Sequence, residues 1–85
     1  MIKYKKIYCD YFGYKQGADW IPCEVCGTSA VDVHHIDGRG EGKDVIENLM
    51  GMCRTHHDQY HNSVGLTKEE LQEIHNQFMK KHGIN

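Results

Sequence analysis

Two short pairs of metal-binding side chains constrain this chain more than any other feature. Cys23 and Cys26 form a Cys-x-x-Cys pair, and Cys53 forms a Cys-x-x-His pair with His56 further along the sequence. Each pair can bring two ligands from one turn, and three thiolates with one imidazole suit the tetrahedral coordination of zinc. We therefore predict a structural Cys₃His zinc site that closes the long loop between the two pairs.

The chain has few large apolar residues, so an additional stabilising element such as a metal site is expected. Ile, Leu, Val and Phe together account for only 17 of 85 residues. A chain of this size buries only roughly 60% of the surface that its unfolded form exposes. A structural zinc site can contribute on the order of 10 kcal/mol to folding, which offsets a small core. We expect residues 1–85 to form a single domain.

The cysteines also allow disulfides or a redox Cys-x-x-Cys pair. The first residues lack the apolar segment of a signal peptide, and no stretch approaches transmembrane length. We therefore expect a cytoplasmic protein with no membrane partner, in which reduced thiols favour metal binding over disulfides. A redox pair usually stands in a βαβ context, which this sequence lacks, and we interpret the leftover Cys9 as a buried free thiol.

The hydrophobic pattern predicts a small α+β fold. The aromatic-rich segment 1–20 has helical spacing that Gly13 and Gly17 interrupt, so we expect a short helix and a turn. Residues 30–36 alternate and are rich in β-branched side chains, which predicts a strand, and residues 48–52 can form a second one. The segment 54–62 is expected to be a helix.

The clearest helix spans about residues 67–82. Thr67 and Glu70 have the spacing of a capping box, and Gly83 is a suitable C′ residue after the last turn. We interpret His75 and His82 as surface histidines of this helix. Its apolar face comprises Leu71, Ile74, Phe78 and Met79.

A second polar group lies between the two halves of the zinc site. It consists of His34, His35, Asn48, His57 and His61. His57 and His61 are one turn apart on the expected helix, so they share a face if His56 is the fourth zinc ligand. The reverse assignment of His56 and His57 would break that geometry. Strand alternation places His34 and His35 on opposite faces, so both can serve one site only if the strand ends or kinks near His35.

This group resembles the motifs of the HNH endonucleases, a branch of the His-Me finger or ββα-metal nucleases. The resembling segments are residues 33–37, 47–49 and 53–57, within a core of about residues 22–62. The bracketing cysteines are similar to those of the zinc-stapled members, although the usual Cys-x-x-Cys-His is here Cys53-x-x-His56-His57. The resemblance implies a ββα-metal core with flanking helices, in an intracellular protein of bacterial or phage type.

The resemblance also implies a role for each residue of the polar group. His35 would be the general base that takes a proton from water, and Asn48 would hold the loop and help to orient that base. His34, His57 and His61 would bind a divalent cation for catalysis, which could be Mg²⁺, Mn²⁺, Ni²⁺ or Zn²⁺. Histidine titrates near neutral pH, and a dication stabilises the charge that develops on a reacting phosphate. We expect a DNA endonuclease that hydrolyses phosphodiester bonds by nicking or by double-strand cleavage.

The net charge of the chain argues against a nucleic-acid partner. The formal net charge is −2, whereas nucleic-acid binders usually carry a basic footprint. Bound cations add positive charge that the sequence does not count. Arg39 and Lys43 in the glycine-rich loop, and Arg54 at the start of the following helix, are candidate phosphate contacts. We expect DNA as the partner, and a partner protein could supply sequence specificity.

Other functions remain open from the residues alone. The main alternative is a non-catalytic zinc-binding module that recognises nucleic acid or a protein. The histidine group could also be a purely structural second metal site, or belong to a nuclease fold that has lost activity. A thiol-active domain would require a reactive Cys23 and Cys26. Three carboxylates are either supporting partners of the histidines or solvated surface: Asp32, Asp37 and Asp58.

Overall fold

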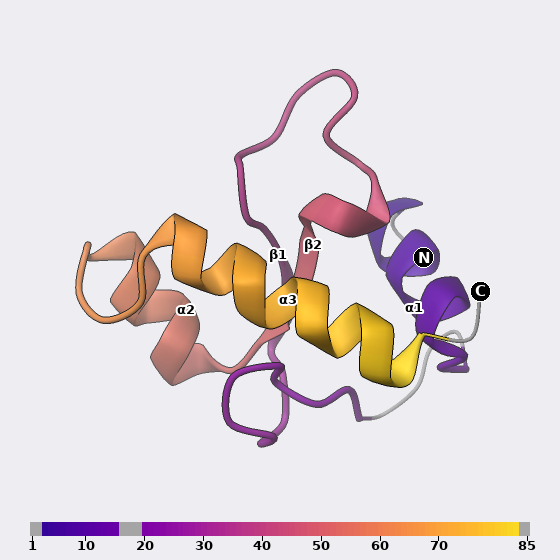
Figure 1. The fold of residues 1–85 in the computed structure, drawn as a ribbon, viewed down its shortest axis with the longest axis horizontal. Coiled ribbons are helices and arrows are strands. Elements are labelled where there is room, and N and C mark those ends of the chain that lie inside the picture. The colour runs from indigo at the N-terminus through magenta and orange to yellow at the C-terminus, as the bar shows by residue number, and fades with distance from the viewer. Residues whose placement is uncertain (1–2, 16–19, 84–85) are drawn as a thin grey trace.

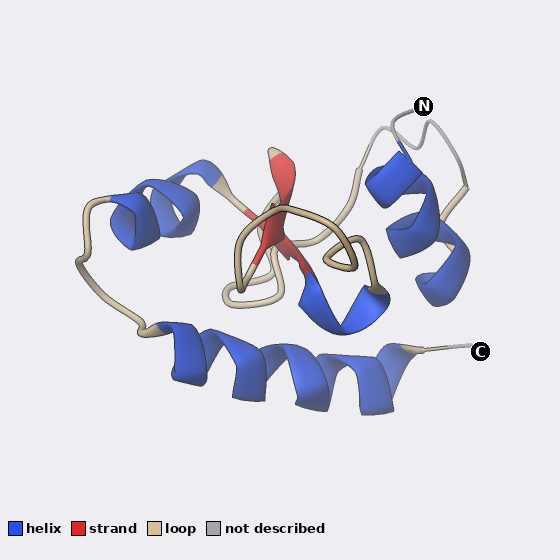
Figure 2. Ribbon diagram, turned by 90° about the horizontal axis from the view of Figure 1, so that it is seen from above, coloured by secondary structure: helices blue, strands red, loops and turns tan. Residues whose placement is uncertain are grey.

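The computed structural model describes residues 3–15 and 20–83. Within these ranges the chain forms a small α+β fold with three α-helices, one short 3₁₀ helix and a two-stranded sheet. Helix α3 runs across the sheet, while α1 and α2 lie on opposite sides of it (Figures 1 and 2). No helix in the described ranges is both long and apolar enough to cross a membrane. In chain order the elements are α1 (Lys3–Phe12), β1 (Asp32–His35), η1 (Ile46–Asn48), β2 (Leu49–Met52), α2 (Arg54–His61) and α3 (Lys68–His82).

The two strands pair antiparallel, and their register sets which side chains share a face. His34 lies opposite Met50, and His35 lies opposite Leu49. The strand is shorter than the predicted 30–36, because the Ala30 N–H bonds to the carbonyl of Ile21 instead of extending the pair. Strand β1 ends at His35, which is where the sequence required a break for His34 and His35 to serve one site.

Each face of the sheet is covered by its own apolar cluster. On the α1 face, the aromatic side chains of the N-terminal helix pack on the strands, which confirms the short helix predicted from their spacing. The positive φ of 76° at Gly13 lets the chain turn away after α1, whereas Gly17 lies outside the described residues. The α1-side cluster contains Tyr4, Tyr8, Phe12, Val33 and Leu49, and the α3-side cluster contains Ile36, Met50, Met52 and Leu71.

Helix α3 begins and ends as predicted, but its C-terminal cap differs from the prediction. The Thr67 hydroxyl accepts the Glu70 N–H at 3.1 Å, and the Glu70 carboxylate accepts the Thr67 N–H at 3.0 Å, so the capping box is confirmed. Gly83 follows the last turn, but it is the C-cap rather than the predicted C′ residue, and its backbone is extended, with φ −66°. A Cβ at this position would lie 2.6 Å from the carbonyl oxygen of Met79 and 2.6 Å from a ring carbon of Tyr11. Glycine is needed here for close packing rather than for its backbone freedom.

The surface interpretation of His75 is wrong. His75 is 0% exposed, its Nε2 donates to the Ile46 carbonyl at 2.6 Å, and its Nδ1 lies 2.7 Å from Glu24 Oε1. The other oxygen of Glu24 accepts bonds from the Tyr8 hydroxyl and, at 3.2 Å, from the Gly51 N–H. A buried imidazole is tolerated because both of its nitrogens have partners. His82, by contrast, is exposed as expected.

Candidate metal centres

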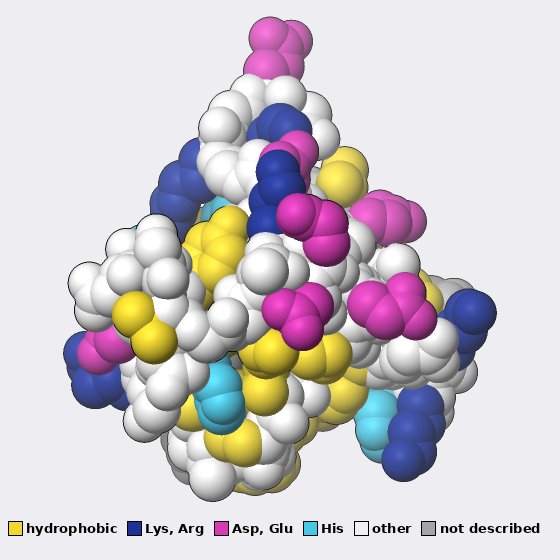
Figure 3. Space-filling view, turned by 60° about the vertical axis from the view of Figure 1, so that its left-hand side comes forward, with side chains coloured by type: hydrophobic (Ala, Val, Ile, Leu, Met, Phe, Trp, Pro, Cys, Tyr) yellow, Lys and Arg dark blue, Asp and Glu magenta, His cyan; other side chains and the backbone are white. Residues whose placement is uncertain are grey.

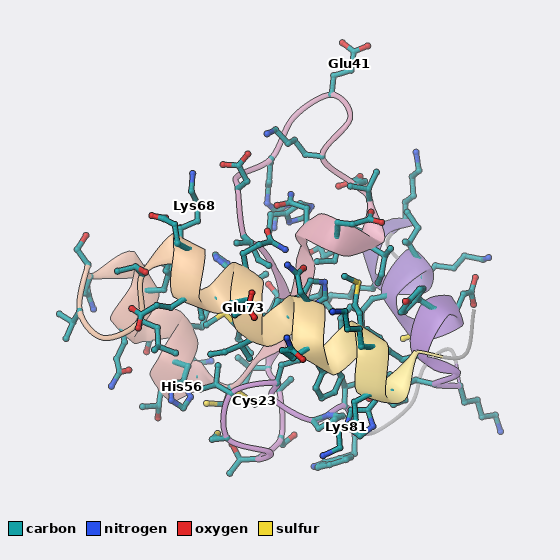
Figure 4. The ribbon with its side chains drawn as sticks, in the orientation of Figure 1. Cys23, Glu41, His56, Lys68, Glu73 and Lys81 are labelled. Atoms are coloured by element: carbon teal, nitrogen blue, oxygen red, sulfur yellow. The ribbon has the colours of Figure 1, made fainter. Side chains whose placement is uncertain are left out.

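The first candidate centre joins a tight turn to the start of α2. The turn at residues 22–29, called here the cysteine knuckle, is closed by the Cys23 N–H to Thr28 carbonyl bond at 2.6 Å. The Gly27 N–H also bonds to the Cys23 carbonyl at 2.8 Å. These bonds bring Cys23 and Cys26 together, while α2 presents His56 from its first turn (Figure 4, where Cys23 and His56 are labelled).

The geometry of this cluster suits a tetrahedral ion. The ligand atoms of Cys23, Cys26, Cys53 and His56 all lie within 4.8 Å of one another. The sulfurs of Cys26 and Cys53 are 3.8 Å apart, as are the Cys23 sulfur and His56 Nδ1. Zinc–sulfur bonds of about 2.3 Å at tetrahedral angles place two sulfurs roughly 3.8 Å apart. The Cys₃His cluster can therefore hold a metal ion, and its donors are compatible with structural zinc.

The local electrostatics act differently on two of these thiols. Burial raises the pKa of Cys23, although the backbone N–H groups of Cys53, Cys26 and Val25 donate toward its sulfur. Burial also raises the pKa of Cys53, but hydrogen bonds from His56, Thr28 and Cys26 together outweigh it and lower the value to about 6. Cys53 is thus available as the thiolate, which is the form that binds metal. Cys9 lies apart from this cluster as a buried free thiol, as predicted.

The second candidate centre is a group of three imidazoles, called here the histidine triad (His34, His57 and His61). Their ligand nitrogens lie within 4.8 Å of one another, and the Nε2 atoms of His57 and His61 are 3.2 Å apart. His34 comes from β1, whereas His57 and His61 come from successive turns of α2. His56 points to the cysteines instead, which is the arrangement that the i, i+4 argument required.

His34 is the buried member of the triad and is held in the form that binds metal. Burial, together with the charges of the nearby His57 and His61, lowers its pKa to about 4. Its Nε2 is buried and has no hydrogen-bond partner among the described residues. A buried imidazole nitrogen without a partner, facing two other imidazoles, fits a cation ligand.

His35 lies beside the triad but has different neighbours. Its Nε2 is 2.7 Å from the Asp44 carboxylate, and its ring packs edge-on against Tyr4 with the centroids 4.7 Å apart. Its Nδ1 is buried and has no partner among the described residues. Although His34 and His35 stand on opposite faces of the sheet, both line one cavity of about 330 Å³, together with the rest of the triad and Arg39.

Asn48 braces the glycine-rich loop at residues 37–45, and within the described part of the chain its side chain makes its hydrogen bonds to this loop. Its Oδ1 accepts the Asp37 N–H at 2.7 Å, and its Nδ2 donates to the carbonyls of Gly38 and Lys43 at 3.1 and 3.0 Å. The braced loop carries Asp44, which orients the His35 ring. Asn48 therefore acts on His35 through the loop.

The three predicted phosphate contacts have different surroundings. Arg39 lines the cavity, and its guanidinium carbon lies 5.2 Å from the centroid of the Tyr4 ring. Lys43 is paired with Asp37, with its Nζ 2.7 Å from the carboxylate. Arg54 is exposed at the start of α2. Only Arg39 among these three is placed at the cavity wall.

The carboxylate that contacts His35 was not predicted from the sequence. Among the described residues, neither Asp32, Asp37 nor Asp58 hydrogen-bonds to a histidine of the two centres; Asp32 acts on His34 through its charge alone. Asp44 is the carboxylate that contacts His35, which lies beside the histidine triad. This contact was hard to predict, because the loop that returns Asp44 to the end of β1 bends through three glycines.

Comparison with known proteins adds no relative. No family model, no curated protein and no solved structure matches this chain.

Proposed function

We propose that this protein is a metal-dependent endonuclease that hydrolyses phosphodiester bonds in DNA. The observation that carries the proposal is the single cavity that the histidine triad and His35 line together. Hydrolysis of a phosphodiester requires a base for water and positive charge at the phosphate. At the cavity wall, His35 is suited to act as the base, and the three imidazoles of the histidine triad are suited to bind the cation.

The proposed roles follow from the partners of each side chain. The triad would hold a divalent cation, which when bound supplies positive charge to the phosphate and to the leaving oxygen. His35 would be the general base: Asp44 fixes the proton on Nε2, which leaves Nδ1 as the nitrogen that accepts a proton from water. Arg39 would donate to a phosphate oxygen at the same wall.

The order of the elements supports a ββα-metal core of the HNH type. Strands β1 and β2 and helix α2 follow one another along the chain, with η1 and the loop between the strands, and β1 and α2 line the cavity. The zinc proposed at the Cys₃His cluster would fix the cysteine knuckle to the start of α2. Because His56 and His57 are adjacent in the sequence, zinc bound by His56 would also fix the orientation of α2 that places His57 in the triad.

A plasmid-nicking assay tests the proposal. Purified, zinc-loaded protein is incubated with supercoiled plasmid and added Mg²⁺, Mn²⁺ or Ni²⁺, beside His35→Ala and the matched control His82→Ala. His82 is exposed on α3 and outside both centres. Nicking that requires added metal, persists in His82→Ala and is lost in folded His35→Ala is the expected result. Equal nicking by all three proteins would assign the activity to a contaminant.

The alternative is a non-catalytic zinc-binding module, and the charge distribution favours it. The net charge is −2, and the side of the molecule in Figure 3 carries Asp and Glu side chains interspersed with Lys and Arg rather than a continuous basic patch. Such a surface repels a polyanion unless bound cations compensate for it. This alternative predicts no metal-dependent nicking and no effect of His35→Ala on any binding function.

A further inference from the structure

Tyr4 lies outside every motif that supports the proposed function, yet it contacts two residues of the proposed site. It belongs to α1, is 8% exposed, and packs its ring edge-on against His35 at an interplanar angle of 67°. The guanidinium carbon of Arg39 lies 5.2 Å from the centroid of the same ring. Both His35 and Arg39 line the cavity of the histidine triad. The ring therefore connects the N-terminal helix to the cavity wall.

Arg39 keeps its full charge in this arrangement. Within residues 3–15 and 20–83 no carboxylate pairs with Arg39, whereas Lys43 and Lys68 both pair with Asp37 and Lys5 pairs with Asp32. An aromatic face attracts a guanidinium without occupying its N–H donors or cancelling its charge. The donors of Arg39 consequently remain free for an anion, and the planar guanidinium can bind two oxygens of a phosphate.

The Tyr4 ring is itself fixed by a buried network one helical turn away. Tyr8, at i+4 on the same face of α1, is 0% exposed, and its hydroxyl bonds to the Glu24 carboxylate. The Gly51 N–H of β2 donates to that hydroxyl at 3.2 Å. Helix α1 is thus tied to the sheet and to the cysteine knuckle. The backbone of Tyr4 therefore cannot move away from the sheet without disturbing these buried bonds, and the packing of the ring against His35 holds the side chain itself.

We propose that Tyr4 is a positioning residue that holds the Arg39 guanidinium at the cavity wall, where Arg39 binds a phosphate of the nucleic-acid backbone. The inference rests on the proposed function, because it assigns the phosphate to the substrate of the same cavity. It assigns α1 a part in substrate binding in addition to its part in the core. The aromatic face, rather than the hydroxyl, performs this role, because the guanidinium lies over the ring.

The test measures DNA binding without cleavage. The chain is loaded with one equivalent of zinc, no second cation is added, and the anisotropy of a fluorescent DNA duplex is followed at several salt concentrations. Tyr4→Leu should raise Kd about two- to fivefold, the range expected from losing one cation–π contact. The conservative Tyr4→Phe keeps the aromatic face and should retain the affinity. Arg39→Ala should lower the salt slope by about 0.9, and Tyr4→Leu/Arg39→Ala should bind no more weakly than Arg39→Ala alone.

Several outcomes would overturn the inference. Equal losses in Tyr4→Leu and Tyr4→Phe would assign the effect to the hydroxyl, and additive losses in the double variant would show that Tyr4 does not act through Arg39. If Tyr4→Leu does not fold, as judged by zinc content and thermal unfolding, the wild-type chain still provides a test. Its Arg39 side-chain protons should show upfield NMR shifts from the Tyr4 ring that change on addition of DNA, and shifts typical of a free arginine would contradict the contact.

The nicking assay separates this inference from the proposed function. Metal-dependent nicking that His35→Ala abolishes, combined with an unchanged Kd in Tyr4→Leu, would leave the endonuclease standing and remove the role of Tyr4. A wild-type chain that neither nicks plasmid nor binds the duplex would remove both.

Discussion

Replacing His75 by Leu should destabilise the protein far more than the same change at His82. His75 is fully buried, and both of its nitrogens have partners, Glu24 at 2.7 Å and the Ile46 carbonyl at 2.6 Å. Leucine would leave the Glu24 carboxylate and that carbonyl buried with one partner fewer each. Leaving a buried hydrogen-bonding group without its partner typically costs about 1–3 kcal/mol, and more for a charged group such as the Glu24 carboxylate. That is a large part of the roughly 5–15 kcal/mol that stabilises a small domain.

The assay is equilibrium unfolding in urea at a fixed ratio of one zinc per chain, followed by far-UV circular dichroism. His82→Leu is the matched control, because His82 is exposed on the same helix. This substitution should change the unfolding free energy by less than about 0.5 kcal/mol. Tyr8→Phe removes one hydroxyl from the same network and should cost about 1–3 kcal/mol. If His75→Leu lies within about 1 kcal/mol of His82→Leu, the buried network does not hold α3 to the knuckle.

Three further predictions concern the metal centres and the proposed base. Removing zinc with a chelator should withdraw on the order of 10 kcal/mol of folding free energy, so cooperative unfolding should be lost; an unchanged melting curve in the zinc-free chain would contradict the role of the Cys₃His cluster. The pKa of His34 is lowered from 6.5 to about 4 by burial and neighbouring imidazoles, so as the pH falls the unfolded chain binds this proton first. Stability should be independent of this group above pH 6.5 and fall by up to roughly 3 kcal/mol between pH 6.5 and 4. Thermal unfolding of His34→Gln should lack this part of the pH dependence, and parallel curves for the two proteins would refute it. Asp44→Ala should reduce kcat of plasmid nicking by roughly 10- to 100-fold, whereas Glu41→Ala, at the tip of the same loop and pointing away from it (Figure 4), should not.

The grouping of the metal ligands could be predicted because it depends on local geometry. Residues three or four apart on a turn or helix face one another whatever the rest of the fold does, so His56 and the pair of His57 and His61 were assigned to different centres from spacing alone. The capping box at Thr67 and Glu70 was predictable for the same reason. In each case the signal and the contact lie within one turn of chain.

Contacts between distant segments could not be predicted in the same way. Glu24 and His75 are 51 residues apart, and only the packing of α3 on the knuckle brings them together. The pattern did hold one signal, because His75 follows Leu71 by one turn and therefore falls on the apolar stripe of α3. No pattern in the sequence indicated that Asp44 and Tyr4 contact His35. Their contacts with His35 depend on the path of a glycine-rich loop and on the docking of α1.

The number of metal ions that one chain binds tests the central claim most directly. Native mass spectrometry of the zinc-loaded chain titrated with Ni²⁺ or Mn²⁺ should show one zinc and one further ion per chain. The variant His57→Ala should retain the zinc and lose the second ion, while His82→Ala should bind both. A single tightly bound ion in the wild-type chain, or a second ion that His57→Ala does not affect, would contradict a cation site at the histidine triad and with it the proposed nuclease.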